Sequence, residues 1–156
     1  MLALARPAAA HLMPAGQGAV RLVGDSAYVV VAVPVAALTG FDDNRDGRID
    51  VAEVNRHRTA LNSQVSRLLQ WRDGEGAEGR LLFEDLLISH ADLPGFQGAD
   101  HVVVVRRYQW GRPVRSLAVK AGVKVALRCI RDAQTEATTF TRAGAEHTFF
   151  AQRPAP

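Results

Sequence analysis

The sequence predicts a mainly β fold, an antiparallel β-sandwich-like domain that is interrupted once by an acidic loop and an amphipathic helix. Three observations predict it. Short segments rich in β-branched residues fill most of the chain, one segment repeats apolar residues at helical spacing, and one loop holds five carboxylates within twelve residues. With 156 residues the chain has the length of one domain. We expect residues 11–156 to form it, with the loop and helix inserted at about residues 36–71.

Two strands are predicted around the turn "GDS" in "AVRLVGDSAYVVVAVPV", residues 19–35. The second is almost continuously apolar, which predicts burial on both faces. Pro34 should end the ladder, because proline has no N–H to donate. Further strands are predicted at residues 80–90, 101–110, 114–120, 123–130, 137–142 and 146–152.

The segment "DVAEVNRHRTALNSQVSRLLQW" is the one clear helix. Its apolar residues recur at three- and four-residue spacing, which places them on one face. The glycines of "RDGEGAEG", residues 72–79, should end the helix and form a flexible surface connection. The apolar stripe consists of Val51, Val54, Leu61, Val65, Leu68 and Leu69.

The acidic loop "DDNRDGRIDVAE", residues 42–53, predicts a calcium site. Calcium takes six to eight oxygen ligands, and a twelve-residue loop encloses the ion if the chain turns sharply at its centre. The spacing D-x-[DN]-x-[DN]-G-x5-E is filled at every position, with Gly47 permitting the turn. A helix-capping box alone would explain two of the acids, and a solvated acidic turn is the alternative interpretation. The predicted ligands are side-chain oxygens of Asp42, Asn44, Asp46, Asp50 and Glu53 and the main-chain oxygen of Arg48.

This loop resembles the EF-hand family of calcium-binding proteins over residues 36–60. The resemblance implies a bidentate Glu53 and a short β-contact between Ile49 and a partner loop. With one loop and one helix, we expect a structural, constitutively filled site. The whole chain resembles small exported bacterial proteins that carry an EF-hand, and more distantly the soluble ectodomain of hydrogenase/urease accessory permease-like proteins.

The N-terminal sequence "MLALARPAAAHLMPAGQG" indicates export. Three small alanines precede His11, as they do before a signal-peptidase cut, so residues 1–10 are interpreted as the remnant of a signal peptide. The expected location is periplasmic or secreted. Cleavage there raises an alternative function in copper handling or as a transporter accessory, because an amino terminus with His11 chelates Cu(II) and Met13 is a soft ligand for Cu(I).

Other functional classes are disfavoured by the sequence. The net charge is +3, but the arginines are scattered and no basic run is interleaved with aromatics, so no nucleic-acid binding is expected. The longest apolar run is too short to span a membrane and contains Pro34. Cys129 lies in an apolar run, where a small buried residue is expected. Neither a nucleophile elbow nor a nucleotide-binding loop occurs.

We therefore expect a non-enzymatic, exported, calcium-binding protein whose β-domain binds an unknown protein partner. A carbohydrate- or peptide-binding module is a further alternative. An exposed aromatic patch around Trp110 on a sheet face would be its structural sign.

Overall fold

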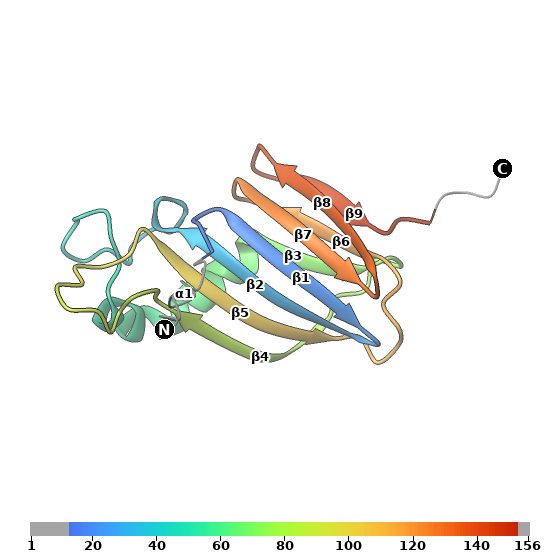
Figure 1. Ribbon diagram of the computed structural model, residues 1–156, viewed down its shortest axis with the longest axis horizontal. Coiled ribbons are helices and arrows are strands. Elements are labelled where there is room, and N and C mark those ends of the chain that lie inside the picture. The colour runs from blue at the N-terminus through green and yellow to red at the C-terminus, as the bar shows by residue number, and fades with distance from the viewer. Residues whose placement is uncertain (1–12, 153–156) are drawn as a thin grey trace, which may run out of the picture.

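The computed structural model describes residues 13–152, which form a mainly β domain of two layers (Figure 1). This confirms the predicted fold class. Nine strands and one α-helix lie within these residues. The helix α1 spans Val51–Leu68, and a short 3-10 helix, η1, spans Val35–Ala37. The strands are β1 Gln17–Val23, β2 Ser26–Pro34, β3 Leu69–Asp73, β4 Arg80–Leu87, β5 His101–Gln109, β6 Leu117–Ala121, β7 Val125–Arg131, β8 Gln134–Phe140 and β9 Ala145–Phe149.

The front layer is a six-stranded sheet in the order β4-β5-β2-β1-β7-β8. Its strands pair antiparallel except for β1 and β7, which run parallel, so the sheet is mixed. The predicted strands on either side of "GDS" form the β1–β2 hairpin. Pro34 is the last paired residue of β2, as its missing N–H predicts.

The second layer contains the three-stranded antiparallel sheet β3-β6-β9 and the helix α1, which lie behind the six-stranded sheet in Figure 1. The helix ends earlier than the sequence predicted. It stops at Leu68 without a glycine, and the chain continues directly into β3. In β3 the side chains of Leu69, Trp71 and Asp73 are buried in alternation with exposed neighbours. This two-residue alternation, paired along β6, replaces the last helical turn.

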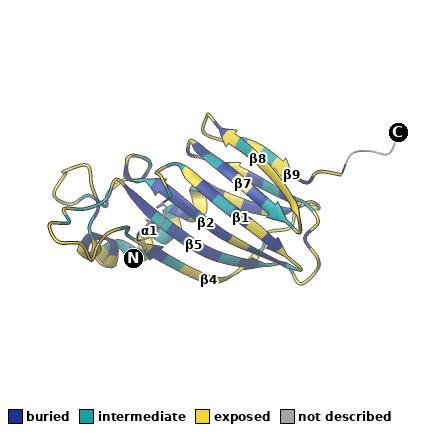
Figure 2. Ribbon diagram, viewed as in Figure 1, coloured by how far each residue is buried: buried dark blue, intermediate teal, exposed yellow. Residues whose placement is uncertain are grey.

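The apolar core fills the space between the two layers. Figure 2 shows buried residues along the central strands of the six-stranded sheet and exposed ones along β4 and β8 at its edges. Burial of these β-branched and aromatic side chains supplies the main driving force for folding. Residues with at most 1% exposure include Val20, Val31, Val33, Leu61, Val102, Val104, Leu117, Val119, Leu127 and Phe149.

One charged side chain in this core holds α1 against the sheet. Arg106 of β5 is 2% exposed. Its guanidinium donates to the main-chain oxygen of Asn62 at 2.8 Å and to Ser66 Oγ at 2.8 Å, both on α1. It also forms an ion pair with Glu84 of β4 at 3.4 Å. The helix is therefore fixed over the β4–β5 side of the sheet by directional bonds as well as by apolar packing.

The segment predicted to be a flexible connection, residues 72–79, contains a second buried charge. Asp73 accepts hydrogen bonds from the N–H groups of Ala77 at 2.8 Å and Glu75 at 3.1 Å. Its other oxygen accepts from Arg112 Nη2 at 2.6 Å. Burial raises the pKa of Asp73, but the bonds from Arg112 and the two N–H groups outweigh it, and the pKa lies below 3.8. The turn after β3 is thus fixed by one carboxylate.

Replacing Asp73 with Asn should lower the free energy of unfolding by about 2–3 kcal/mol at neutral pH, because it weakens several charge-assisted bonds at a buried site. The depressed pKa means that this contribution is full above pH 3.8 and is lost as the pH falls through the folded pKa. Urea unfolding at neutral and acidic pH measures both effects. Glu78→Gln, in an exposed pair with Arg72, is the control and should change stability by less than about 0.5 kcal/mol. An Asp73→Asn protein as stable as the wild type at neutral pH would contradict this account.

The loop and helix expected at residues 36–71 occupy the chain between β2 and β3. Residues 1–10, interpreted as a signal-peptide remnant, lie outside the described residues. Among the helices of residues 13–152, none is long and apolar enough to cross a membrane.

Candidate metal centre

The acidic loop connects η1 to α1, and its side-chain oxygens fold back over its own main chain. The Asp42 carboxylate accepts from the N–H of Asp46 at 3.1 Å and of Gly47 at 2.8 Å. Asn44 Oδ1 accepts from the same Asp46 N–H at 3.1 Å, and Asp46 Oδ1 accepts from the N–H of Arg48 at 2.8 Å. Gly47 has a φ of +78°, which L side chains rarely adopt. The spacing of the predicted ligands therefore sets the path of the turn.

Glu53 closes the loop from the first turn of α1. Its Oε2 accepts from the Asp50 N–H at 3.0 Å, while Asp50 Oδ1 accepts from the Glu53 N–H at 2.8 Å, which completes a capping box. The other oxygen, Oε1, accepts from the N–H of Asp43 at 2.8 Å. Glu53 is only 5% exposed. One buried carboxylate thus joins the start of the loop to the start of the helix.

The predicted ligands are of the type that a hard cation such as Ca²⁺ prefers, because all six ligating atoms are oxygens. Within residues 13–152, however, no three side chains of His, Cys, Asp or Glu come together in a group that could hold a metal ion. The carboxylates of the loop accept main-chain N–H bonds instead. Each of these oxygens keeps a second lone pair, so the bonds do not exhaust its capacity as a ligand. Calcium binding stays a prediction, and it requires the oxygens to converge.

Ile49 forms an isolated β-bridge, and its partner is a segment of the same domain and not the partner loop that the resemblance implied. Its N–H donates to the Ala99 oxygen at 2.9 Å, and the Ala99 N–H donates to the Ile49 oxygen at 2.9 Å. Ile49 is fully buried. Ala99 belongs to the β4–β5 connection, which lies beside the acidic loop at one end of the layers (Figure 1). The bridge therefore joins the acidic loop to the β4–β5 connection.

A cluster on the outside of the loop was not predicted from the sequence. The carboxylate of Asp43 forms an ion pair with Arg56 and contacts His57 Nε2 at 2.9 Å. The bond with His57, followed by that with Arg56, lowers the pKa of Asp43 below 3.8. The ring of His57 also packs edge-on against Phe41 at 5.7 Å between centroids. Since Asp43 and these partners lie more than ten residues apart, the sequence carries no spacing signal for the contact.

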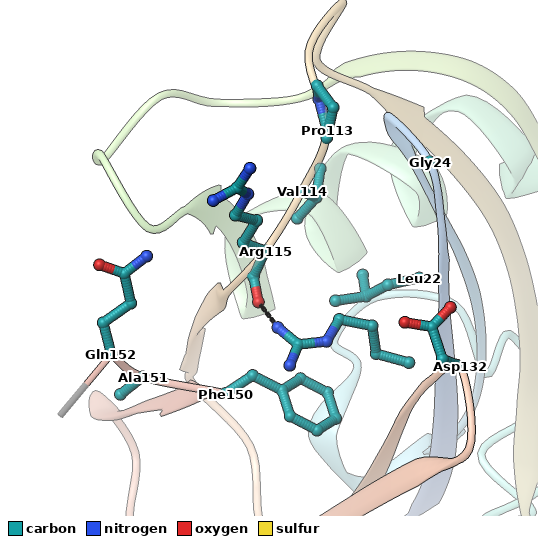
Figure 3. Close-up of a pocket in the computed structure, with 10 residues that line it drawn as sticks. Leu22, Gly24, Pro113, Val114, Arg115, Asp132, Phe150, Ala151 and Gln152 are labelled. Carbon is teal, nitrogen blue, oxygen red and sulfur yellow. Dashed lines mark hydrogen bonds between the residues drawn. The ribbon is translucent and has the colours of Figure 1, made fainter.

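A pocket of about 560 Å³ opens at the opposite strand ends, near the C-terminal end of β9 (Figure 3). Arg115, Asp132 and Phe150 lie around it. The guanidinium of Arg131 lies 4.3 Å from the Phe150 ring centroid and donates to the main-chain oxygen of Arg115. Its remaining bond goes to Gln134 Oε1 at 2.9 Å. Arg131 therefore holds the wall of this pocket, which contains none of the predicted calcium ligands.

Three other residues singled out in the sequence have the following positions. Cys129 is fully buried, and burial, followed by the charge of Glu136, raises the pKa of its thiol to about 12. Trp110 is half-buried, and its Nε1 donates to the Ala77 oxygen at 2.8 Å, so it packs under the turn after β3 instead of forming an exposed patch. His11 lies outside the described residues, and copper binding with Met13 stays a prediction.

No protein-family model matches the chain, and no curated protein sequence matches it significantly. The function is therefore inferred from the residues of the sites themselves.

The bridge between Ile49 and Ala99 requires glycine at position 98. Gly98 has a φ of +103°, and a Cβ there would lie 2.9 Å from the Cβ of Arg48. Gly98→Ala should open the bridge and speed amide exchange of Ile49 and Ala99 by about tenfold, measured by NMR. Gly95→Ala is the matched control, since Gly95 also has a positive φ, +77°, but open space around its Cβ. Equal acceleration in both variants would mean that backbone strain alone, and not the close approach of the two segments, controls the bridge.

Proposed function

We propose that this chain is a non-enzymatic calcium-binding domain that presents its β-sheet to a partner. One Ca²⁺ is bound through Asp42, Asn44, Asp46, Asp50, Glu53 and the main-chain oxygen of Arg48. The observation that carries the proposal is Glu53, a carboxylate that is 5% exposed and forms no ion pair within the described residues. The N–H groups of Asp43 and Asp50 donate to it and offset part of the cost of burying a carboxylate, but neither group carries a charge. A calcium ion would add the missing positive charge at the position where the spacing requires a bidentate ligand.

The charges of the loop support the same conclusion. Four predicted ligands are carboxylates within twelve residues, whereas the outward Asp43 already has Arg56 as its partner. Repulsion among the other four would be relieved by a divalent ion. The ion would then fix the junction between β2 and α1, because its ligands come from both the loop and the first helical turn.

Export is part of the proposal. The alanine-rich start of the sequence supports a periplasmic or secreted location, where calcium is available at millimolar concentration. An affinity of about 10⁻⁴–10⁻³ M, typical of extracellular modules, would keep the site filled there. Because the calcium concentration would be at or above the dissociation constant, the ion would stay bound and have a structural role.

Calcium should raise the melting temperature by about 5–10 °C at a hundredfold excess over Kd, because the ion binds only the native loop. The measurement is a thermal melt of residues 11–156, first in EDTA and then in CaCl₂. Glu53→Gln should abolish the shift. Glutamine keeps the acceptor oxygen that the capping box needs but loses the one that accepts from the Asp43 N–H, so the variant should remain folded in EDTA with a lower melting temperature than the wild type.

Glu78→Gln is the matched control, because Glu78 is an exposed glutamate outside the loop, and it should keep the full shift. Isothermal titration of the wild type with CaCl₂ and with MgCl₂ then measures selectivity. A wild type that melts alike in EDTA and CaCl₂ would refute the proposal and identify the segment as a capped acidic turn.

A further inference from the structure

Arginines that are far apart in the sequence lie together on the outer face of the six-stranded sheet. This face is directed away from α1 and the three-stranded sheet. Strand register places Phe83 of β4 opposite Arg107 of β5, Arg107 opposite Tyr28 of β2, and Tyr28 opposite Arg21 of β1. The guanidinium of Arg107 lies over the Tyr28 ring, 5.4 Å from its centroid. Alternating arginines and aromatics therefore form a continuous row across four strands. We call the face that contains this row the arginine face.

Two more arginines lie on the same face. Arg128 of β7 shares a register row with Ala19, and Arg80 of β4 shares one with Gln109. None of the four arginines of the face forms an ion pair within residues 13–152. The only carboxylate on the outward positions of its strands is Asp85, which already pairs with Arg58 of α1 at 3.0 Å. Asp25 of the β1–β2 turn lies at the border of the face, where it accepts from Gln109 Nε2 at 2.9 Å and from Ser26 Oγ at 3.0 Å. The four arginines therefore exceed the negative charge of the face.

The same face borders an exposed apolar edge. Strand β4 is the last strand of the sheet, and Phe83 is 53% exposed, Leu87 47% and Leu82 40%. Tyr28 is 43% exposed. Figure 2 shows β4 as largely exposed along its length. An apolar strip of this kind beside a basic face, on one side of a small domain, marks an interaction surface.

The arginines and the apolar side chains together decide which kind of partner fits this surface. A second copy through the same face would bring arginines against arginines, which is unfavourable. A single-stranded nucleic acid would use the arginines and the two rings, but it would leave the leucines of β4 without a partner. An anionic lipid surface uses all of them, because lipid phosphates accept bidentate arginine bonds while apolar side chains enter the boundary between headgroups and acyl chains.

We propose that the arginine face and the β4 edge dock this domain peripherally on an anionic lipid membrane. The free N–H and C=O groups of the β4 edge need water, so docking reaches the headgroup region and no deeper. Phe83 and Leu87 supply apolar contact, and Arg21, Arg107 and Arg128 contact phosphates. This names the partner that the proposed function left open, and it does not depend on calcium.

The test is co-sedimentation with vesicles in EDTA, where the calcium site is empty by design. Wild-type protein should bind vesicles that contain about a third phosphatidylglycerol and should not bind pure phosphatidylcholine, and salt should weaken the binding. Arg21→Gln with Arg128→Gln should reduce the partition constant about fivefold for each arginine, since both side chains are exposed and their loss leaves the fold intact. Phe83→Ser should reduce it about fivefold.

Two matched control variants test whether binding depends on this surface or only on the total charge and the exposed apolar area of the protein. Arg142→Gln removes an exposed arginine in the β8–β9 turn, and Leu93→Ser removes a leucine that is 50% exposed in the β4–β5 connection. Both should bind as the wild type does. Absent binding to anionic vesicles, equal binding to neutral ones, or unchanged binding by the arginine and Phe83 variants would each overturn the proposal. Salt-sensitive binding to an oligothymidine or to polyglutamate without vesicle binding would replace lipid with that class of partner.

Discussion

The structure depends on one constraint, which is that the inner face of a six-stranded sheet must be covered across its whole width. The second sheet has only three strands, and α1 covers the part over β4 and β5. Arg106 fixes that arrangement, because its donors bond to α1 while its counter-ion Glu84 lies on the edge strand. A buried guanidinium tolerates few other geometries, since each lost bond leaves a desolvated charge. The inserted helix is therefore a structural part of the sandwich and not an appendage to it.

That role explains why the start of the helix is so strongly specified. The capping box of Asp50 and Glu53 sets the first turn, and the additional bond from Glu53 to the Asp43 N–H fixes the direction of the loop that enters it. On the outer side, Asp43 binds Arg56 and His57 one to two turns further along. Five polar contacts around one junction orient α1 over the core. An ion in the loop would act on this junction and not on the sheet itself.

The sequence predicted the elements whose pattern is local. The alternation in β1, the apolar run of β2 and the helical stripe of α1 are all present, and the loop spacing predicted the turn at Gly47 and the capping box. It missed β3, because Leu68, Leu69 and Trp71 fit the end of a helical stripe as well as a strand, and no turn residue separates the two. The parallel pairing of β1 with β7 joins segments about a hundred residues apart, which no local pattern encodes. The same holds for Ala99, whose contact with Ile49 arises only when the β4–β5 connection folds beside the loop.

Tertiary register also changes how the charges are interpreted. Arg21, Arg107 and Arg128 lie far apart along the chain, yet three strands of one sheet bring them to one face. The acidic loop is separate from that face, but the two are physically connected. Ile49 of the loop pairs with Ala99, which lies two residues before β5 begins. In a pair of EF-hand loops, an ion changes the angle between two helices and opens a groove. Within residues 13–152 the single α-helix is fixed to the sheet by Arg106, so a bound ion has no second α-helix there to move. Its proposed effect is to order the loop, the β4–β5 connection and the end of the sheet as one rigid unit.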